Sequence, residues 1–198
     1  MTDFSNRRAP WGQLVDPTLL IESGDSPEPR EDYEDLHLKL GSTESLETQQ
    51  SRFIDCFIEL DRSIDWHGSR SRYRNCTISI GRIGSLDLTG TAMNMTSIEN
   101  SRIGFANLAG CEAQDVLFKN CTFEALDLTA AKFKRVWFEN CTVEDLDLRD
   151  FEGNSVDFTG LDFAKVQGLQ NLRNGTINET QLMQISSGLA MLAGIKVD

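Results

Sequence analysis

The side chains that most often carry out chemistry in proteins are sparse in this sequence of 198 residues. Its two histidines, His37 and His67, have no metal-ligand spacing to the cysteines, which are odd in number and form no CxxC pair. The cysteines are Cys56, Cys76, Cys111, Cys121 and Cys141. The sequence also contains no nucleophile motif and no phosphate-binding loop. We therefore predict that this protein is not an enzyme and that it holds no cofactor and no metal.

Aspartates that alternate with leucines, as at Asp145 and Asp147, are the remaining candidates for chemistry, because paired carboxylates can act as general acid and base. Such a role needs a pocket that perturbs the pKa of one carboxyl group. Whether these aspartates line a pocket depends on the elements that position them, and an internal repeat decides what those elements are.

Apolar residues recur at every fifth position over most of the chain. A second series, mostly small or apolar, lies two residues before the first, and the other three positions of each five are mostly polar. A helix repeats every 3.6 residues and a strand every two, so neither explains this period. The first series runs through Leu88, Met93, Ile98, Ile103, Leu108, Ala113, Phe118, Phe123, Leu128, Phe133, Phe138, Val143 and Leu148.

A period of twenty is nested in the period of five. The twenty residues from Asp115 match the twenty from Arg135 at nine positions. Four repeats of five would therefore close one coil, and residue n would stack on residue n+20 at the strand spacing of ~4.8 Å. The stacked columns are chemically uniform, as in Ile58, Ile78, Ile98, Phe118, Phe138 and Phe158. This pattern predicts an all-β solenoid with a continuous apolar core.

The predicted solenoid also indicates where the cysteines and the alternating aspartates lie. All five cysteines fall in the small inward series, where parallel Cβ directions do not suit a disulfide, so we expect buried, reduced thiols. The alternating aspartates fall on a regular, solvated wall with no pocket. The column of Asp87, Asn107, Asp127 and Asp147 stacks like charges, which is unfavourable unless the side chains bond to turn backbone or serve a partner.

The blocks SLDLTG, FANLAG, ALDLTA and DLDLRD resemble variants of the A(D/N)Lxx consensus of the pentapeptide repeat family. The resemblance covers roughly Leu36 to Val166 and implies a right-handed quadrilateral β-helix. Its register is weakest from Asp61 to Gly68, where we expect a short insertion or loop. About 6.5 coils would make a rod ~31 Å long.

The repeat divides the chain into three parts: an acidic and flexible N-terminal arm (1–35), the pentapeptide repeat β-solenoid (36–167) and a C-terminal segment (168–198). Asn178 suits the N-cap of a short α-helix, and Gly194 suits its end. One face of this helix would carry Leu182, Ile185, Leu189 and Leu192. We expect an end cap, or a dimer interface, since the resemblance implies that some family members form homodimers through a C-terminal helix.

Charge is the feature that bears most directly on partners. The chain has 31 acidic and 19 basic residues, a net charge of −12, which argues against direct nucleic-acid binding. Residues 51–110 contain 6 acidic and 7 basic side chains, whereas residues 111–177 contain 12 and 7. The rear half therefore predicts an acidic interaction surface. Its candidate residues are Glu124, Asp127, Glu144, Asp145, Asp147 and Asp150.

These observations predict a non-catalytic binding protein that presents a solenoid surface to a protein partner. The alternative, implied by the resemblance, is an acidic DNA mimic that binds DNA gyrase or another topoisomerase. No segment approaches the ~20 apolar residues of a membrane span, and the N-terminal residues contain no apolar run suited to a signal peptide. We expect a cytoplasmic protein that does not bind membranes.

Overall fold

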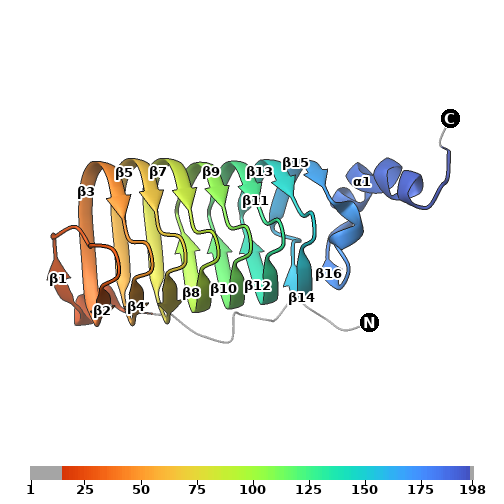
Figure 1. Cartoon of the computed structure of the whole chain (residues 1–198). Coiled ribbons are helices and arrows are strands. Elements are labelled where there is room, and N and C mark those ends of the chain that lie inside the picture. Colours follow the sequence, from red (N-terminus) through yellow and green to blue (C-terminus); the bar gives the residue numbers. More distant parts are fainter. Residues whose placement is uncertain (1–14, 197–198) are drawn as a thin grey trace.

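The computed structural model describes residues 15–196, which form a rod of stacked coils with a helix beyond the last coil (Figure 1). The strands are β1 (Ile21–Ser23), β2 (Asp32–Glu34), β3 (Leu36–Glu47), β4 (Arg52–Ile54), β5 (Phe57–His67), β6 (Arg72–Arg74), β7 (Thr77–Asp87), β8 (Ala92–Glu99), β9 (Arg102–Asn107), β10 (Glu112–Lys119), β11 (Thr122–Asp127), β12 (Lys132–Glu139), β13 (Cys141–Asp147), β14 (Glu152–Asp157), β15 (Leu161–Gln167) and β16 (Gly175–Thr176). The helices are the 3-10 turns η1 (Pro17–Leu19) and η2 (Leu169–Asn171) and the α-helix α1 (Glu179–Leu192).

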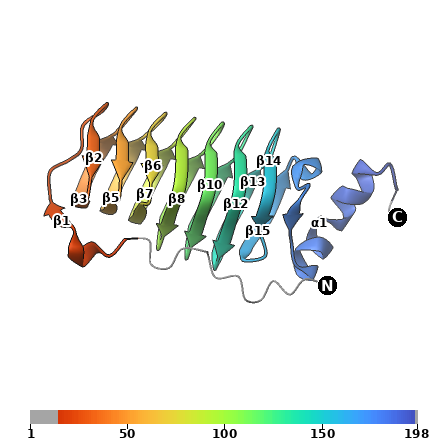
Figure 2. The same cartoon turned by 90° about the horizontal axis from the view of Figure 1, so that it is seen from below.

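Every strand pairs in parallel with the strand one coil away, and from β2 to β15 that register is twenty residues. Phe118 lies beside Ile98 on one side and Phe138 on the other, and Leu126 lies beside Leu146. The odd strands β3 to β15 form one ladder and the even strands β2 to β14 form another (Figure 2). Strand β7 pairs with both β9 and β8, so the two ladders join into one sheet. The predicted β-solenoid of twenty-residue coils is therefore confirmed.

The core of the rod is a set of side-chain columns that run along its axis. Phe118 and Phe138 are almost fully buried, and their rings stack with centroids 4.9 Å apart. Near the front end, the rings of Phe53 and Tyr73 stack in the same way at 5.1 Å. Each coil repeats the backbone of the coil before it, so similar side chains at corresponding positions stack on one another. The apolar contact therefore extends through the length of the solenoid.

All five cysteines are buried and free, as the inward series predicted. Burial raises the pKa of the Cys111 thiol to about 12, although a hydrogen bond from the Thr91 hydroxyl partly opposes this rise. Burial likewise raises the pKa of Cys76. A thiol with a raised pKa is a poor nucleophile at neutral pH, so Cys76 and Cys111 serve as small core residues.

The insertion expected between Asp61 and Gly68 is absent, and that prediction was wrong. Strand β5 pairs residue by residue with both β3 and β7 through this segment. Ser63 takes an inward position, and its hydroxyl donates to the carbonyl oxygen of Asp65 at 2.8 Å. The local hydrogen bond satisfies the buried hydroxyl, so a polar residue occupies an apolar column without breaking the coil.

The coil changes shape at one of its corners halfway along the rod. In the rear coils Asn100, Asn120 and Asn140 occupy this corner with φ between 51° and 53°. Their side-chain amides form a ladder, in which each Nδ2 donates to the preceding Oδ1 at 3.0 Å. In the front coils the same column holds Leu40, Leu60 and Ile80, which are buried and extended. Since Leu and Ile do not readily adopt positive φ, strands β3, β5 and β7 continue through this corner.

The two ends of the rod are closed by different elements. At the front, β2 pairs with β4 and β1 pairs with β3, so hydrogen-bonded structure begins before the predicted boundary at residue 36. The first fourteen residues of the predicted arm lie outside the described residues. At the rear, α1 begins after the N-cap Asn178, as predicted. No helix within residues 15–196 is long and apolar enough to cross a membrane.

Candidate functional site

Asp127 and Asp147 of the predicted acidic surface lie in one column, and both stabilise turns through hydrogen bonds. The Oδ1 atom of Asp127 accepts a hydrogen bond from the backbone N–H of Thr129 at 2.8 Å, and that of Asp147 accepts one from Arg149 at 3.0 Å. Asp87 and Asn107 make the same contact in earlier coils. These side chains cap the turns between strands, which explains why Asp or Asn recurs in this column.

Two of these predicted acidic residues are also neutralised by neighbours. The Arg149 guanidinium donates hydrogen bonds to Asp147 and holds the pKa of that carboxyl below its usual range. Asp145 pairs with Lys165 at 3.3 Å. Sequence position alone could not distinguish these paired carboxylates from free ones, because the cations come from two residues away or from the next coil.

Glu124, Glu144 and Asp150 are the predicted acidic residues for which neither an ion pair nor a side-chain hydrogen bond is found within residues 15–196, whereas Asp127 lacks an ion pair but holds its turn. Glu124 and Glu144 stack one coil apart on the wall of β11 and β13, whereas Asp150 lies at a left-handed corner with φ of 55°. The six predicted residues therefore do not form one surface. The two glutamates border a trough of about 430 Å³ whose outward side chains also include Thr122, Thr142 and Asp162. We call this depression the acidic trough.

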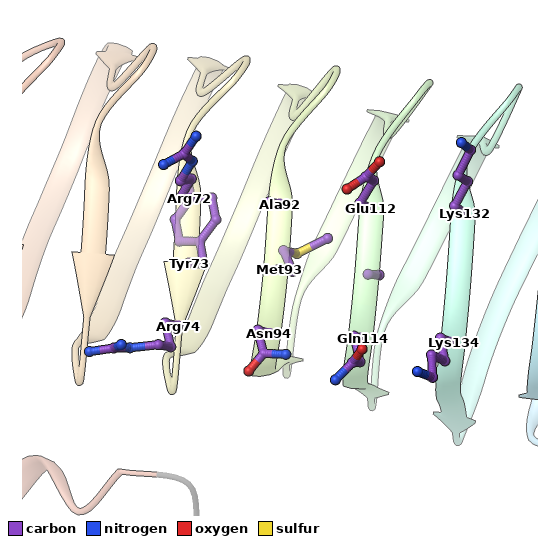
Figure 3. Close-up of a pocket in the computed structure, with 11 residues that line it drawn as sticks. Arg72, Tyr73, Arg74, Ala92, Met93, Asn94, Glu112, Gln114, Lys132 and Lys134 are labelled. Carbon is purple, nitrogen blue, oxygen red and sulfur yellow. The ribbon is translucent and has the colours of Figure 1, made fainter.

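A second trough, of about 410 Å³, lies on the wall formed by β6, β8, β10 and β12, and the sequence did not reveal it (Figure 3). Arg72 and Arg74 lie at one end, and Lys132 and Lys134 lie at the other. None of these four cations forms an ion pair among the described residues. We call this depression the basic trough.

The side chains along the middle of the basic trough are mostly uncharged, and several of them are short. Ala92 and Ala113 contribute only methyl groups, and Asn94 and Gln114 line one margin opposite Glu112 (Figure 3). The longer cationic side chains at both ends rise above this floor. The four cations lie up to 62 residues apart in the sequence, in segments that also contain acidic residues. The spacing is the signal that could have revealed this cluster of cations. Arg72 shares a column with Lys132, and Arg74 shares one with Lys134, because each pair is separated by three coils of twenty residues.

The residues predicted for a dimer interface divide into two groups. Ile185 is buried against the last coil and Leu189 packs partly on the core, while Leu182 and Leu192 are about half exposed, at 48% and 55%. Gln181, which the sequence did not single out, is buried beside Ile185. The inner face of α1 is thus a cap, and its outer face leaves Leu182 and Leu192 uncovered, together with Met183 and Met191.

Within residues 15–196 no group of three or more His, Cys, Asp or Glu side chains is arranged to hold a metal ion. Both histidines instead contact a single carboxylate, His37 with Glu59 at 3.2 Å and His67 with Glu47 at 3.9 Å. Each contact joins neighbouring coils.

No family model matches this sequence, and no curated protein matches it. Two solved structures of trypsin-treated variants of QnrB1, a plasmid-mediated fluoroquinolone resistance protein, resemble the chain at 13% sequence identity. The first covers 86% of this chain and 96% of its own with a TM-score of 0.32, and the second covers 86% and 99% with a TM-score of 0.30. The strand register of this chain itself shows a parallel β-solenoid. The resemblance to pentapeptide repeat proteins is a resemblance of the sequence repeat pattern.

Proposed function

We propose that this chain is a non-catalytic binding protein whose solenoid wall docks a protein partner. The observation that supports the proposal is the basic trough, in which Arg72, Arg74, Lys132 and Lys134 have no ion-pair partners in the described residues and outnumber Glu112, the one acidic side chain among the lining residues. Unpaired cations at the ends of a concave surface attract carboxylates and steer an acidic partner toward it.

The wall suits an extended segment that runs along the rod. The two cationic ends are separated by three coil steps, or ~14 Å at the strand spacing, which about four residues of extended chain would span. Asn94 and Gln114 lie between them and can both donate and accept hydrogen bonds to a peptide backbone. The partner we propose is therefore a protein with acidic side chains about four residues apart in an extended segment.

Quantitative co-purification from native cells tests this function. Lys132→Glu with Lys134→Glu should deplete the partner relative to the parent, because both changes reverse the charge of the trough. Lys119→Glu with Lys165→Glu changes the net charge equally at positions that line neither end of the trough, and should retain the partner. Equal loss from both variants would contradict a specific docking wall.

A DNA mimic that binds DNA gyrase is the second candidate, and the acidic trough is the observation that favours it. Glu124, Glu144 and Asp162 are exposed on one wall without ion pairs in the described part of the chain. A rod of ~31 Å would span roughly nine base pairs of DNA. A gyrase supercoiling assay with and without the purified protein tests this candidate. Inhibition that is lost in Glu124→Lys with Glu144→Lys would support it, and an inactive parent would reject it.

A further inference from the structure

The first long strand of the rod has a front edge that is only partly covered (Figure 1). Strand β3 pairs along most of its length with β5 behind it, but in front it pairs only with β1, over Leu36 to Leu38. From Lys39 onward no strand within residues 15–196 lies in front of β3. We call residues 41–47 of this strand the open edge. Uncovered strand edges bind other strands, because their N–H and C=O groups have no partners.

The glycines of one column show that the space in front of the open edge is free. A Cβ atom at Gly81 would clash with the carbonyl oxygen of Asp61, which belongs to the coil in front of it. Gly41 occupies the same column in the first coil, and a Cβ atom there would meet nothing within 4 Å. The described residues thus leave this part of the front layer unfilled.

The hydrogen bonds show the same gap. The carbonyl oxygen of His67 accepts a hydrogen bond at 2.8 Å from the N–H of Thr48, which lies one coil in front. The equivalent carbonyl oxygen in the first coil, that of Glu47, receives no backbone hydrogen bond from the described residues. Glu28 is the residue that the register would place in front of it. Its N–H donates instead to the hydroxyl of Tyr33 at 2.6 Å.

The gap arises because the chain takes a short path between β1 and β2. Only six residues (24–29) separate β1 from Arg30, whose N–H donates to the carbonyl oxygen of Gln49 at 3.0 Å. The coil behind uses ten residues (39–48) for the corresponding path. Pro27 is buried within the short path, and the inward leucines of β3 are buried as well. The backbone edge is therefore open while the apolar core is closed.

The front end also carries most of the net negative charge of the chain. Residues 15–50 contain 10 acidic and 2 basic side chains, a net charge of −8, whereas the whole chain has −12. On the open edge itself Glu44 and Glu47 are exposed, and Glu44 has no ion pair among residues 15–196. A strand that adds to this edge must therefore carry cations, because the field of the front end repels an acidic one.

We propose that the open edge binds a basic, extended segment of a partner protein, which adds to the sheet as one more parallel strand. Its main chain takes the hydrogen bonds that a preceding coil supplies elsewhere in the rod, which is the usual basis of β-strand addition. Thr43 and Leu46 occupy inward columns, so the residues opposite them must be small or apolar. The residues opposite Glu44 and Glu47 must be Lys or Arg. This surface is separate from the basic trough and selects a partner of the opposite charge.

Fluorescence anisotropy with a labelled, end-blocked peptide tests the proposal. The probe is the tripeptide Lys-Val-Lys repeated twice, which places valines opposite Thr43 and Leu46 and lysines opposite the outward side chains. The parent should bind it at about 20 mM salt. The same peptide with every backbone nitrogen methylated keeps its charge but has no N–H donors, so it should bind at least roughly tenfold more weakly. Equal binding of the two peptides would overturn the proposal, because charge alone would then explain the contact.

Two variants of the protein locate the binding. The N–H of Ser42 faces the front, as that of its equivalent Thr122 does toward Ser101, and an edge strand tolerates proline at such a position. Ser42→Pro should therefore weaken peptide binding roughly tenfold, through the loss of one donor. Glu44→Lys should also weaken it. Glu124→Lys is the matched control, because it makes the same change in the same column four coils behind and should leave binding unchanged. Circular dichroism of each variant confirms that the coil is intact.

Three outcomes would overturn the proposal. One is a parent that does not bind the peptide at low salt. Another is equal weakening by Glu44→Lys and Glu124→Lys, since net charge rather than the open edge would then be responsible. The third is a parent that dimerises in sedimentation velocity and becomes monomeric in Ser42→Pro, because this result would assign the open edge to a second copy of the chain.

Discussion

The side-chain amide of Gln181 donates a hydrogen bond to the carbonyl oxygen of Phe158 at 2.7 Å, and thereby joins the C-terminal helix to the last coil. The same amide donates to Leu161 at 2.6 Å, and its oxygen accepts from the backbone of Asn178 at 2.8 Å. One buried side chain therefore caps both the helix and carbonyl groups that the end of a solenoid would leave unpaired.

Gln181→Ala should destabilise the protein by about 2–3 kcal/mol, because it leaves buried carbonyl groups without a donor. Urea denaturation followed by circular dichroism measures the change. Gln184→Ala, at an exposed position one turn on, should be within about 0.5 kcal/mol of the parent. Equal stability of both variants would mean that α1 does not close the rod.

Phe138→Ala should cost about 3–5 kcal/mol, because it leaves a cavity between Phe118 and Phe158 in the stacked column. Phe105→Ala is the control, since that ring is 42% exposed and its removal leaves no comparable cavity. Thermal or urea unfolding distinguishes the two. A Phe138→Ala variant that unfolds with the parent would place this residue outside the core.

The asparagine ladder predicts a matched pair of effects at Asn120, whose φ is 53°. Asn120→Val should destabilise by about 2–3 kcal/mol, because a β-branched residue is strained in the left-handed region and the ladder bonds are lost. Asn120→Gly loses the same bonds without the strain, and should cost about 1 kcal/mol. Similar losses in the two variants, measured by urea denaturation, would show that backbone strain does not govern this corner.

Acid stability should depend on the contact between Asp115 and Arg135. The Arg135 guanidinium donates through Nε and Nη2 to this mostly buried carboxyl and lowers its pKa. A folded-state pKa below the unfolded value stabilises the protein above pH ~3.9, and this contribution is lost as the pH falls through the folded-state value. Arg135→Gln should therefore weaken the dependence of unfolding free energy on pH below about 4. An unchanged profile would contradict the assignment.

The outer face of α1 gives a prediction about assembly, in line with the homodimer expected from the sequence. Association through Leu182 and Leu192 would bury apolar area near acidic coils, so it should persist or strengthen at high salt. Leu182→Asp with Leu192→Asp should abolish such a dimer in light scattering. Ile185 and Leu189 are unsuitable targets, because changing them removes the cap. A parent that is monomeric at high salt would leave α1 as a cap alone.

The sequence alone was enough to predict the solenoid, its register and its core. Phe118 and Phe138 are twenty residues apart and meet because four five-residue repeats close one coil, so linear spacing translates directly into contact. The burial of Cys121 and Cys141 and the start of α1 directly after the N-cap Asn178 followed from the same local rules. Ser63 is the exception, because a single polar residue in an apolar column is typical of a break in the repeat, whereas here a backbone carbonyl satisfies its hydroxyl.

Only the tertiary structure decided which charges are available to a partner. Asp127 and Glu124 are both acidic residues of one strand, yet the first holds a turn and the second is free. Arg72 and Lys132 line one trough although sixty residues separate them. A five-residue period fixes which side chains point inward, because that depends on position within the repeat. Whether an outward side chain meets a backbone N–H, an opposite charge or solvent depends on its neighbours in adjacent coils, and these come together only when the chain is wound.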